Sequence, residues 1–204
     1  MEYQRLSVDE KKLRELLVGK RLQRLHISNP VCLASVDSTQ LYMADELRSS
    51  TEGDLVTSKV QTCGKGRGDR NWISQTGGLW LTLTLRPPRP EILSEIPLMT
   101  TKAIVMAFEG AGLSSCTIKS PNDVYCHGRK IAGVLADARV LGNSSIVYLG
   151  VGININNDPS EIREIQDIAT SFKQITGLTI DLVEFNADFL KKLDEEYEKV
   201  ILTA

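Results

Sequence analysis

The chain has 204 residues, of which 42% are hydrophobic and 25% charged, a composition typical of a single globular domain. Its formal net charge of -2 argues against a general nucleic-acid-binding protein, whose surface would be basic. The four cysteines have neither zinc-ligand spacing nor the pattern of a disulfide framework. No apolar run is long enough to cross a membrane and the first residues are charged, so we expect a cytoplasmic protein.

The first half of the chain mixes helical and strand patterning. A short helix is predicted over 9–18, and the weakly alternating stretch 22–36 predicts one or two strands. A second helix is predicted over about 39–49. The segment 54–60 reads as a strand, and 78–85 alternates with period two, which makes it the clearest strand of the chain.

The second half continues with an amphipathic helix over about 95–110, after a proline-rich connection. Three further strands are predicted over 115–119, 129–140 and 145–153. The last two of these flank a turn at Leu141-Gly-Asn-Ser144, and the strongest helix lies near 182–201. Because hairpins outnumber β-α-β units, we expect an α+β fold with a mixed, largely antiparallel sheet and flanking helices.

The glycine loop, residues 61–72 (QTCGKGRGDRNW), combines three glycines with three cations. Glycines at 64, 66 and 68 allow positive φ and close approach to a ligand. Lys65, Arg67 and Arg70 add positive charge, and a guanidinium group matches phosphate and carboxylate bidentately. Neither the P-loop nor the dinucleotide-binding spacing fits. The loop therefore predicts a site for a small anion, and a surface loop with solvated charges is the alternative.

A second unusual segment covers residues 119–133 (KSPNDVYCHGRKIAG). Its Pro-Asn-Asp sequence predicts a β-turn, and His127-Gly128 predicts a hairpin. Lys130 opens an apolar strand, where its ammonium can be held near a site, and Gly133 permits a ligand to approach that strand closely. A plain turn with a hairpin and a binding site are both compatible with this segment.

Two shorter segments add to the picture. In residues 150–156 (GVGININ), the glycines indicate a bulge or a ligand against the backbone, and period-two alternation places Asn154 and Asn156 on one face. In residues 37–40 (DSTQ), Ser38 or the preceding aspartate is a suitable helix N-cap. The same segment is equally able to offer hydroxyl and N–H groups to the polar head of a ligand.

These four segments, in this order and spacing, resemble the catalytic domain of biotin–protein ligases. That family typically carries a DSTN-like cap, a Q-x-x-G-R-G-R-x-G-R-x-W loop, a K-W-P-N-D motif followed by K-x-x-G, and G-x-G-x-N-x-N. The resemblance covers about residues 33–175, including Ala169-Thr-Ser-Phe172. It implies the class II aminoacyl-tRNA synthetase/biotin ligase-like fold.

The resemblance also implies a two-step reaction. Biotin and ATP would form biotinyl-5′-AMP and pyrophosphate in the presence of Mg²⁺, whose protein ligands we leave unassigned. A lysine of a biotin carboxyl carrier protein, part of a biotin-dependent carboxylase, would then accept the biotinyl group. The slightly acidic net charge predicts no DNA partner, and the lack of a long apolar run predicts no membrane partner. Dimers through edge strands occur in the family, so the resemblance makes a homodimer possible.

Carried over by motif, the catalytic residues would be Lys130 and Arg67. The predicted biotin contacts are Ser38, Thr39, Gln40, Gln61, Gly64, Lys65, Gly66, Arg67, Lys130, Gly133 and Gly152. The predicted nucleotide contacts are Arg67, Arg70, Trp72, Asn122, Lys130 and Asn154.

The chain departs from the family pattern at three positions. Lys65 replaces an arginine, Asp69 stands where the loop usually has its second glycine, and Ser120 replaces the tryptophan of K-W-P-N-D. These changes bear on affinity and loop closure more than on the class of reaction. We expect residues 1–204 to be a single catalytic domain, without the N-terminal DNA-binding domain or the C-terminal SH3-like domain of some relatives. Two alternatives are a lipoate or octanoate ligase or transferase of the same fold, and a biotin or biotinyl-AMP binding module without turnover.

Overall fold

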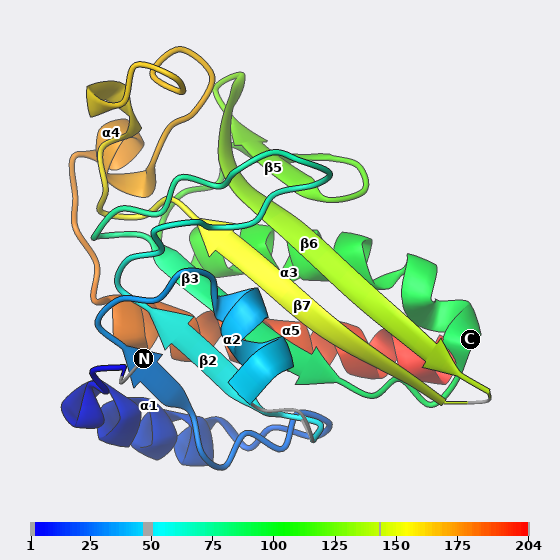
Figure 1. Cartoon of the computed structure of the whole chain (residues 1–204). Helices are drawn as coiled ribbons and strands as arrows, with labels where there is room; N and C mark the ends of the chain where they lie inside the picture. Colours follow the sequence, from blue (N-terminus) through cyan, green and yellow to red (C-terminus); the bar gives the residue numbers. More distant parts are fainter. Residues whose placement is uncertain (1–2, 47–50, 143, 204) are drawn as a thin grey trace.

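The computed structural model describes residues 3–46, 51–142 and 144–203. A seven-stranded sheet has the strand order β1-β2-β3-β7-β6-β5-β4 (Figure 1). The strands are β1 (Val31–Leu33), β2 (Leu55–Ser58), β3 (Leu79–Leu85), β4 (Cys116–Lys119), β5 (Asp123–Cys126), β6 (Arg129–Leu141) and β7 (Ser144–Ile153). Only β1 and β2 pair in parallel, and the other neighbours are antiparallel. The prediction of a mixed, largely antiparallel sheet is confirmed.

Five α-helices and two short 3₁₀ helices flank the described part of the sheet. They are α1 (Ser7–Lys20), α2 (Thr39–Glu46), α3 (Ile96–Gly110), α4 (Phe172–Thr176), α5 (Leu182–Thr203), η1 (Pro90–Ser94) and η2 (Pro159–Glu161). In Figure 1, α2 lies in front of the sheet, whereas α3 and α5 lie behind it. No helix of the described residues is long and apolar enough to span a membrane.

Most predicted elements are present, with two differences among the strands. Only residues 31–33 of the stretch 22–36 form a strand. The structure adds β5, which pairs with β6 across a turn in which His127 and Gly128 both have positive φ, 49° and 78°. Two positive φ angles are the geometry of a tight hairpin turn. Residues 47–49, the end of the second predicted helix, and Asn143 in the predicted turn lie outside the described residues.

The alternation of β3 separates the two faces of the sheet. Its leucines at 79, 81, 83 and 85 belong to the main hydrophobic core with residues of α3 and α5. The intervening Trp80, Thr82 and Thr84 are also buried, on the face that α2 covers. Successive side chains of a strand point to opposite faces. The strand β3 therefore supplies leucines to the core behind the sheet and threonines to the face that α2 covers. The polar face is where the candidate site lies.

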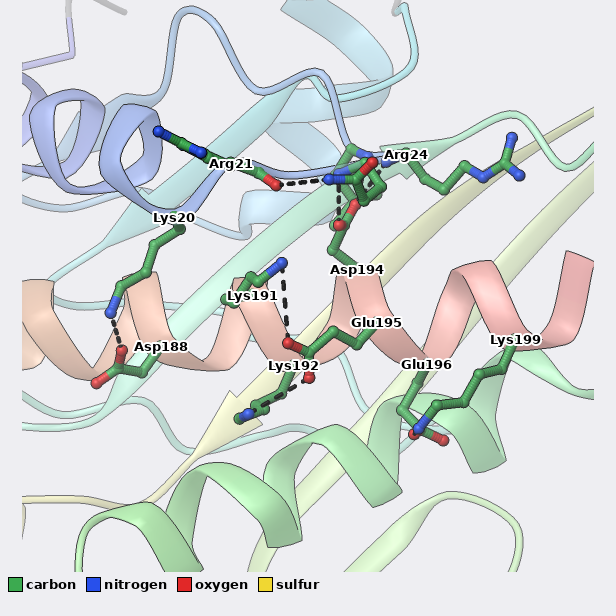
Figure 2. Close-up of polar contacts among 12 residues, drawn as sticks. Lys20, Arg21, Arg24, Asp188, Lys191, Lys192, Asp194, Glu195, Glu196 and Lys199 are labelled. Atoms are coloured by element: carbon green, nitrogen blue, oxygen red, sulfur yellow. Dashed lines mark hydrogen bonds and ion pairs between the residues drawn. The ribbon is translucent and has the colours of Figure 1, made fainter.

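A buried carboxylate fixes α5 to the segment after α1 (Figure 2). Asp194 is fully buried and accepts backbone N–H groups from Gln23, Arg24 and Leu25 at 2.6, 2.8 and 2.7 Å. An ion pair between Lys20 of α1 and Asp188 of α5 joins these two helices at the surface. A buried charge must be compensated by hydrogen bonds, and three N–H donors meet that need. The layer behind the sheet is therefore tied together independently of the site.

Candidate functional site

A pocket of about 350 Å³ opens on the face of the sheet covered by α2. This volume lies within the usual range of small-molecule sites. The start of α2, the glycine loop, the strands β5 to β7 and the segment 165–169 all contribute to its walls. The predicted site residues that line it are Ser38, Thr39, Gln40, Gln61, Lys65, Gly66, Arg67, Arg70, Trp72, Asn122, Lys130, Gly133, Gly152 and Asn154.

Gly64 is the predicted contact that does not line the pocket. It is buried within the glycine loop, and a Cβ there would lie 2.4 Å from the carbonyl oxygen of Trp72 and 2.8 Å from the hydroxyl of Ser74. Such distances leave no room for a side chain. The structure therefore gives Gly64 a role in folding the loop.

The glycine loop folds back on itself. Gly66 donates its N–H to the carbonyl of Arg70 at 2.8 Å, and Trp72 donates to the carbonyl of Gly64 at 2.7 Å. The side chains of Lys65, Arg67 and Arg70 are exposed, and none forms an ion pair with a carboxylate of the described residues. A compact loop that carries uncompensated positive charge at a pocket suits an anionic ligand.

A β-bulge orients Lys130 toward the pocket. Tyr125 pairs with Lys130 while Val124 pairs with Ala132, so Ile131 is the extra residue of β6. The bulge brings Lys130 and Gly133 to the same side, where a Cβ on Gly133 would lie 3.0 Å from Cε of Lys130. The three-residue spacing of the K-x-x-G motif thus has a geometric cause, because a regular strand would put these two positions on opposite faces.

The ammonium of Lys130 has two neighbours inside the pocket. Its Nζ lies 2.7 Å from Oδ1 of Asp123 and 5.1 Å from the ring centroid of Trp72. The contact with Asp123 is an ion pair without hydrogen-bond geometry, since Oδ1 has no hydrogen-bond partner in the described part of the chain. An oxygen left in this way can accept a bond from an incoming group. The side chain of Lys130 is 29% exposed, so the ammonium remains accessible to a ligand.

Trp72 lies over a pair of glycines. Gly133 and Gly152 are partners in the register of β6 and β7. A Cβ on Gly152 would lie 2.5 Å from the Trp72 ring, and one on Gly133 would lie 2.9 Å from it. The indole Nε1 is buried and has no hydrogen-bond partner among the described residues. The two glycines therefore form a flat platform for the Trp72 ring, and the indole N–H is left without an acceptor in the described part of the chain.

Polar side chains at the start of α2 form one end of the pocket. Thr39 donates its N–H and its hydroxyl to Oε1 of Gln61 at 2.9 and 3.1 Å. Gln40 donates to the carbonyl of Tyr148 at 3.1 Å, and Ser38 is 1% exposed. A Cβ on Gly150 would meet Cδ of Gln40 at 2.9 Å. The side chain of Gln40 therefore fills the space beside Gly150, the first glycine of GVGININ. From the sequence alone, a bulge or a ligand is the expected reason for a glycine there.

The three asparagines of interest lie in different surroundings. Asn122 donates to the carbonyl of Val134 at 3.2 Å and lines the pocket. Asn154 also lines it, but its Oδ1 accepts a bond from Asn157 at 3.0 Å. Because β7 ends at Ile153, the expectation that Asn154 and Asn156 share one strand face is wrong. Asn156 instead binds the backbone of Ile180, at 2.8 and 3.1 Å.

The structure also brings in residues that the sequence predictions do not include. The chief ones are Asp123, Tyr125, Gly150, Ile165, Ile168 and Ala169. Asp123 belongs to the Pro-Asn-Asp motif, so a carboxylate next to two predicted site residues was a usable signal. The segment 165–169 gave no such signal, because its backbone reaches the pocket by pairing Ile168 and Thr170 with Lys130.

Comparison with known proteins decides the family. Residues 32–154, more than half of the chain, match the biotin/lipoate A/B protein ligase family. The chain belongs to this family. It is 37% identical over 153 residues to the bifunctional ligase/repressor BirA of Bacillus subtilis, covering 73% of this chain and 46% of that protein. It thus spans about half the length of that relative.

Two further similarities extend along most of the chain. The biotin–[acetyl-CoA-carboxylase] ligase of Paracoccus denitrificans is 32% identical over 165 residues, covering 75% of this chain and 66% of that protein. The biotin protein ligase of Aquifex aeolicus, solved in complex with biotin and ATP, has 34% identity and a TM-score of 0.76, covering 86% of this chain and 73% of that one. The predicted class II synthetase/biotin ligase-like fold and the resemblance to biotin–protein ligases are confirmed.

Proposed function

We propose that this protein is a biotin–protein ligase, which uses ATP to form biotinyl-5′-AMP and transfers the biotinyl group to a lysine of a biotin carboxyl carrier protein. The observation that carries the proposal is the pocket itself, where Lys130 and the free cations of the glycine loop face one cavity. Similarity to ligases named for biotin, including one solved with biotin and ATP, supports the choice of substrates.

The first step must bring two anions together. An oxygen of the biotin carboxylate attacks the α-phosphorus of ATP, and the bond to the β-phosphate oxygen breaks to release pyrophosphate. Like charges repel strongly in a site of low effective dielectric. We assign Lys130 and Arg67 to neutralising this repulsion and the charge that develops on the α-phosphate. Both line the pocket, and Arg67 has no carboxylate partner among the described residues.

The second step transfers the biotinyl group. The neutral amine of the acceptor lysine attacks the carbonyl of the mixed anhydride, AMP leaves, and the amine proton is lost to form an amide. The anhydride must be sheltered from water until the acceptor arrives. We assign this shelter to the glycine loop, whose Trp72 already covers the backbone of β6 and β7.

Mg²⁺ fits this pocket as a partner of the ATP phosphates. The described residues contain no group of three or more His, Cys, Asp or Glu side chains able to hold a metal. Asp123 is the carboxylate among the lining residues, and it is paired with Lys130. Mg²⁺ commonly binds phosphates and water with only one or two carboxylates. When bound, it would supply further neutralisation of the triphosphate.

The test is biotin-dependent exchange of labelled pyrophosphate into ATP. We expect exchange by the wild type, and a loss of about 10²–10³-fold in Lys130→Ala and in Arg67→Ala, as for other removed transition-state donors. Arg129→Ala is the matched control, because Arg129 neighbours Lys130 in β6 and does not line the pocket. A wild type without exchange and without detectable biotinyl-AMP would refute the proposal.

The same assay separates the alternatives. Exchange with lipoate or octanoate in place of biotin would identify a lipoate-type enzyme of this family. Tight binding of biotin without transfer to any carrier domain would identify a binding module. We further propose that residues 1–204 act as one catalytic domain, which labelling of an acceptor protein tests. We also propose that the protein acts in the cytoplasm, where ATP is available, and cell fractionation tests this location. The homodimer stays a prediction, and light scattering on the full chain measures it.

A further inference from the structure

A continuous chain of hydrogen bonds crosses the base of the glycine loop. It begins at Thr82 of β3, which is fully buried and donates its hydroxyl to Oγ1 of Thr39 at 2.9 Å. Thr39 donates its own hydroxyl to Oε1 of Gln61 at 3.1 Å. These contacts tie the first residue of α2 and the first residue of the loop to the middle of the sheet.

The chain continues on the other side of the Gln61 amide. Nε2 of Gln61 donates to the hydroxyl of Ser74 at 2.7 Å, and Ser74 donates to the carbonyl of Trp72 at 3.1 Å. The hydroxyls of Thr39 and Ser74 each accept a hydrogen bond from the preceding group and donate one to the next. Ser74 is 3% exposed, so water does not replace these bonds readily.

The series of hydrogen bonds ends at Trp72, a residue of the pocket whose ring must be placed accurately. The Trp72 ring rests on Gly152 at a distance that leaves no room for a Cβ. Thr39 and Gln61 line the same pocket as Trp72, whereas Ser74 and Thr82 do not line it. A ligand that forms a hydrogen bond with Thr39 or Gln61 therefore contacts groups that are linked through Ser74 to the carbonyl of Trp72.

We propose that Ser74 is a positioning residue that couples the Thr39–Gln61 end of the pocket to Trp72 and thereby to closure of the glycine loop. This inference deepens the proposed function and rests on it for the identity of the ligand. Ser74 acts through Gln61 and Trp72, because it touches the pocket only through them. The alternative is that Ser74 merely fills space against Gly64.

Two variants separate coupling from packing. Ser74→Ala removes both bonds and some volume, whereas Ser74→Cys keeps the volume and exchanges a strong donor and acceptor for weak ones. If the hydrogen bonds matter, both variants depart from the wild type in the same direction. If packing is the only role, Ser74→Cys behaves as the wild type. Thr76→Ala is the matched control, since Thr76 is exposed and follows Ser74 by two residues.

The first measurement is acrylamide quenching of tryptophan fluorescence without ligand. Trp80 is fully buried, so of the two tryptophans it is Trp72 that reports changes in quenching. We expect a higher quenching constant in Ser74→Ala and Ser74→Cys and an unchanged one in Thr76→Ala. Because no turnover is involved, this measurement tests the coupling even if the wild type shows no exchange activity.

The second measurement is the KM for biotin in the exchange assay. Loss or weakening of the two Ser74 hydrogen bonds predicts an increase of about five-fold in both variants, with kcat within about two-fold of the wild type. Wild-type quenching and KM in Ser74→Cys would overturn the proposal, whatever Ser74→Ala does. If Ser74→Ala fails to fold, Ser74→Cys alone decides.

Discussion

The two faces of the sheet are built for different purposes from the same strands. Behind the sheet, the leucines of β3 pack with Phe108, Phe172 and Leu149 in one continuous apolar core. In front, threonines of β3 and glycines of β6 and β7 leave room for polar groups and for a cavity. The comparison shows where stability and binding reside, because burial of apolar area stabilises the fold whereas vacant space beside polar groups does not.

The front face also contains buried polar atoms without hydrogen-bond partners among the described residues. Nε1 of Trp72 and Oδ1 of Asp123 are buried without hydrogen-bond partners in the described part of the protein, and both residues line the pocket. A buried polar atom without a hydrogen bond costs free energy. On the front face these two groups lie where a ligand can reach them, so binding can supply the hydrogen bonds that the described residues do not. Substitutions on the two faces should therefore affect different quantities.

The largest expected effect is on stability, from the face behind the sheet. Phe108 is fully buried, and its ring stacks on Phe172 with 6.2 Å between centroids and 4° between planes. Phe108→Ala should lower the free energy of unfolding by about 3–5 kcal/mol, measured by urea denaturation, since it removes a large apolar side chain and leaves a cavity. Exchange activity per folded molecule should stay within about two-fold of the wild type.

Val18→Ala is the control for this substitution. Val18 is 75% exposed, and its truncation should change the free energy of unfolding by less than about 0.5 kcal/mol. If Phe108→Ala lost activity in proportion to stability while still folded, the two faces would not be separable.

A smaller effect is expected from the front face. Gly152→Ala puts a Cβ within 2.5 Å of the Trp72 ring, so either the ring or β7 must shift. We expect a weakening of biotin binding of about 1–3 kcal/mol by calorimetry, as for other overpacked sites, with a smaller loss in unfolding free energy. Gly110→Ala is the matched control, because no atom lies within 4 Å of a Cβ at that position. Biotin binding as tight as that of the wild type would contradict the role of the glycine platform.

The sequence predicted the β3 strand and the glycine loop because each rests on local pattern. Alternation over 78–85 alone indicates a strand, and three glycines among cations alone indicate an anion site. Lys130 and Gly133 were predicted as site residues, but the bulge at Ile131 that aligns them was not. A bulge arises from pairing with β5 and with 168–170, which are distant interactions that a window of residues does not contain.

The segment 158–169 is the part that sequence reasoning described least well. Helical patterning is predicted for the last 45 residues as a whole, yet residues 160–169 form the end of the short η2 and turns, and they reach the pocket through Ile165 and Ile168. Their placement depends on Asp158, a single side chain with several partners, and on backbone bonds to Lys130. Contacts of this kind are set by the folded environment, so composition and periodicity do not reveal them.

The smallest expected effect concerns that segment and depends on pH. Oδ1 of Asp158 accepts bonds from the N–H of Ser160 at 2.9 Å and from Nε2 of Gln174 at 2.5 Å. The hydroxyl of Ser160 contributes most to lowering the pKa of Asp158, against an opposing effect of burial, and the backbone N–H and Gln174 lower it further. A lowered folded-state pKa means that the ionised carboxylate stabilises the fold above the ordinary value of 3.8, and that this contribution is lost as the pH falls through the folded-state pKa.

Asp158→Asn keeps the shape and removes the charge, so it should be less stable than the wild type at pH 7. Because the group is partly exposed, we expect the difference in unfolding free energy to stay below about 1 kcal/mol. Urea denaturation should show the difference shrinking as the pH falls below 3.8 and through the lowered folded-state pKa, because the wild-type carboxyl then takes up a proton. Asp167→Asn, an exposed substitution in the same segment, controls for the general effect of removing one negative charge. A difference that did not shrink down to the lowest pH at which the protein stays folded would mean that shape, and not charge, lets Asp158 hold this wall of the pocket.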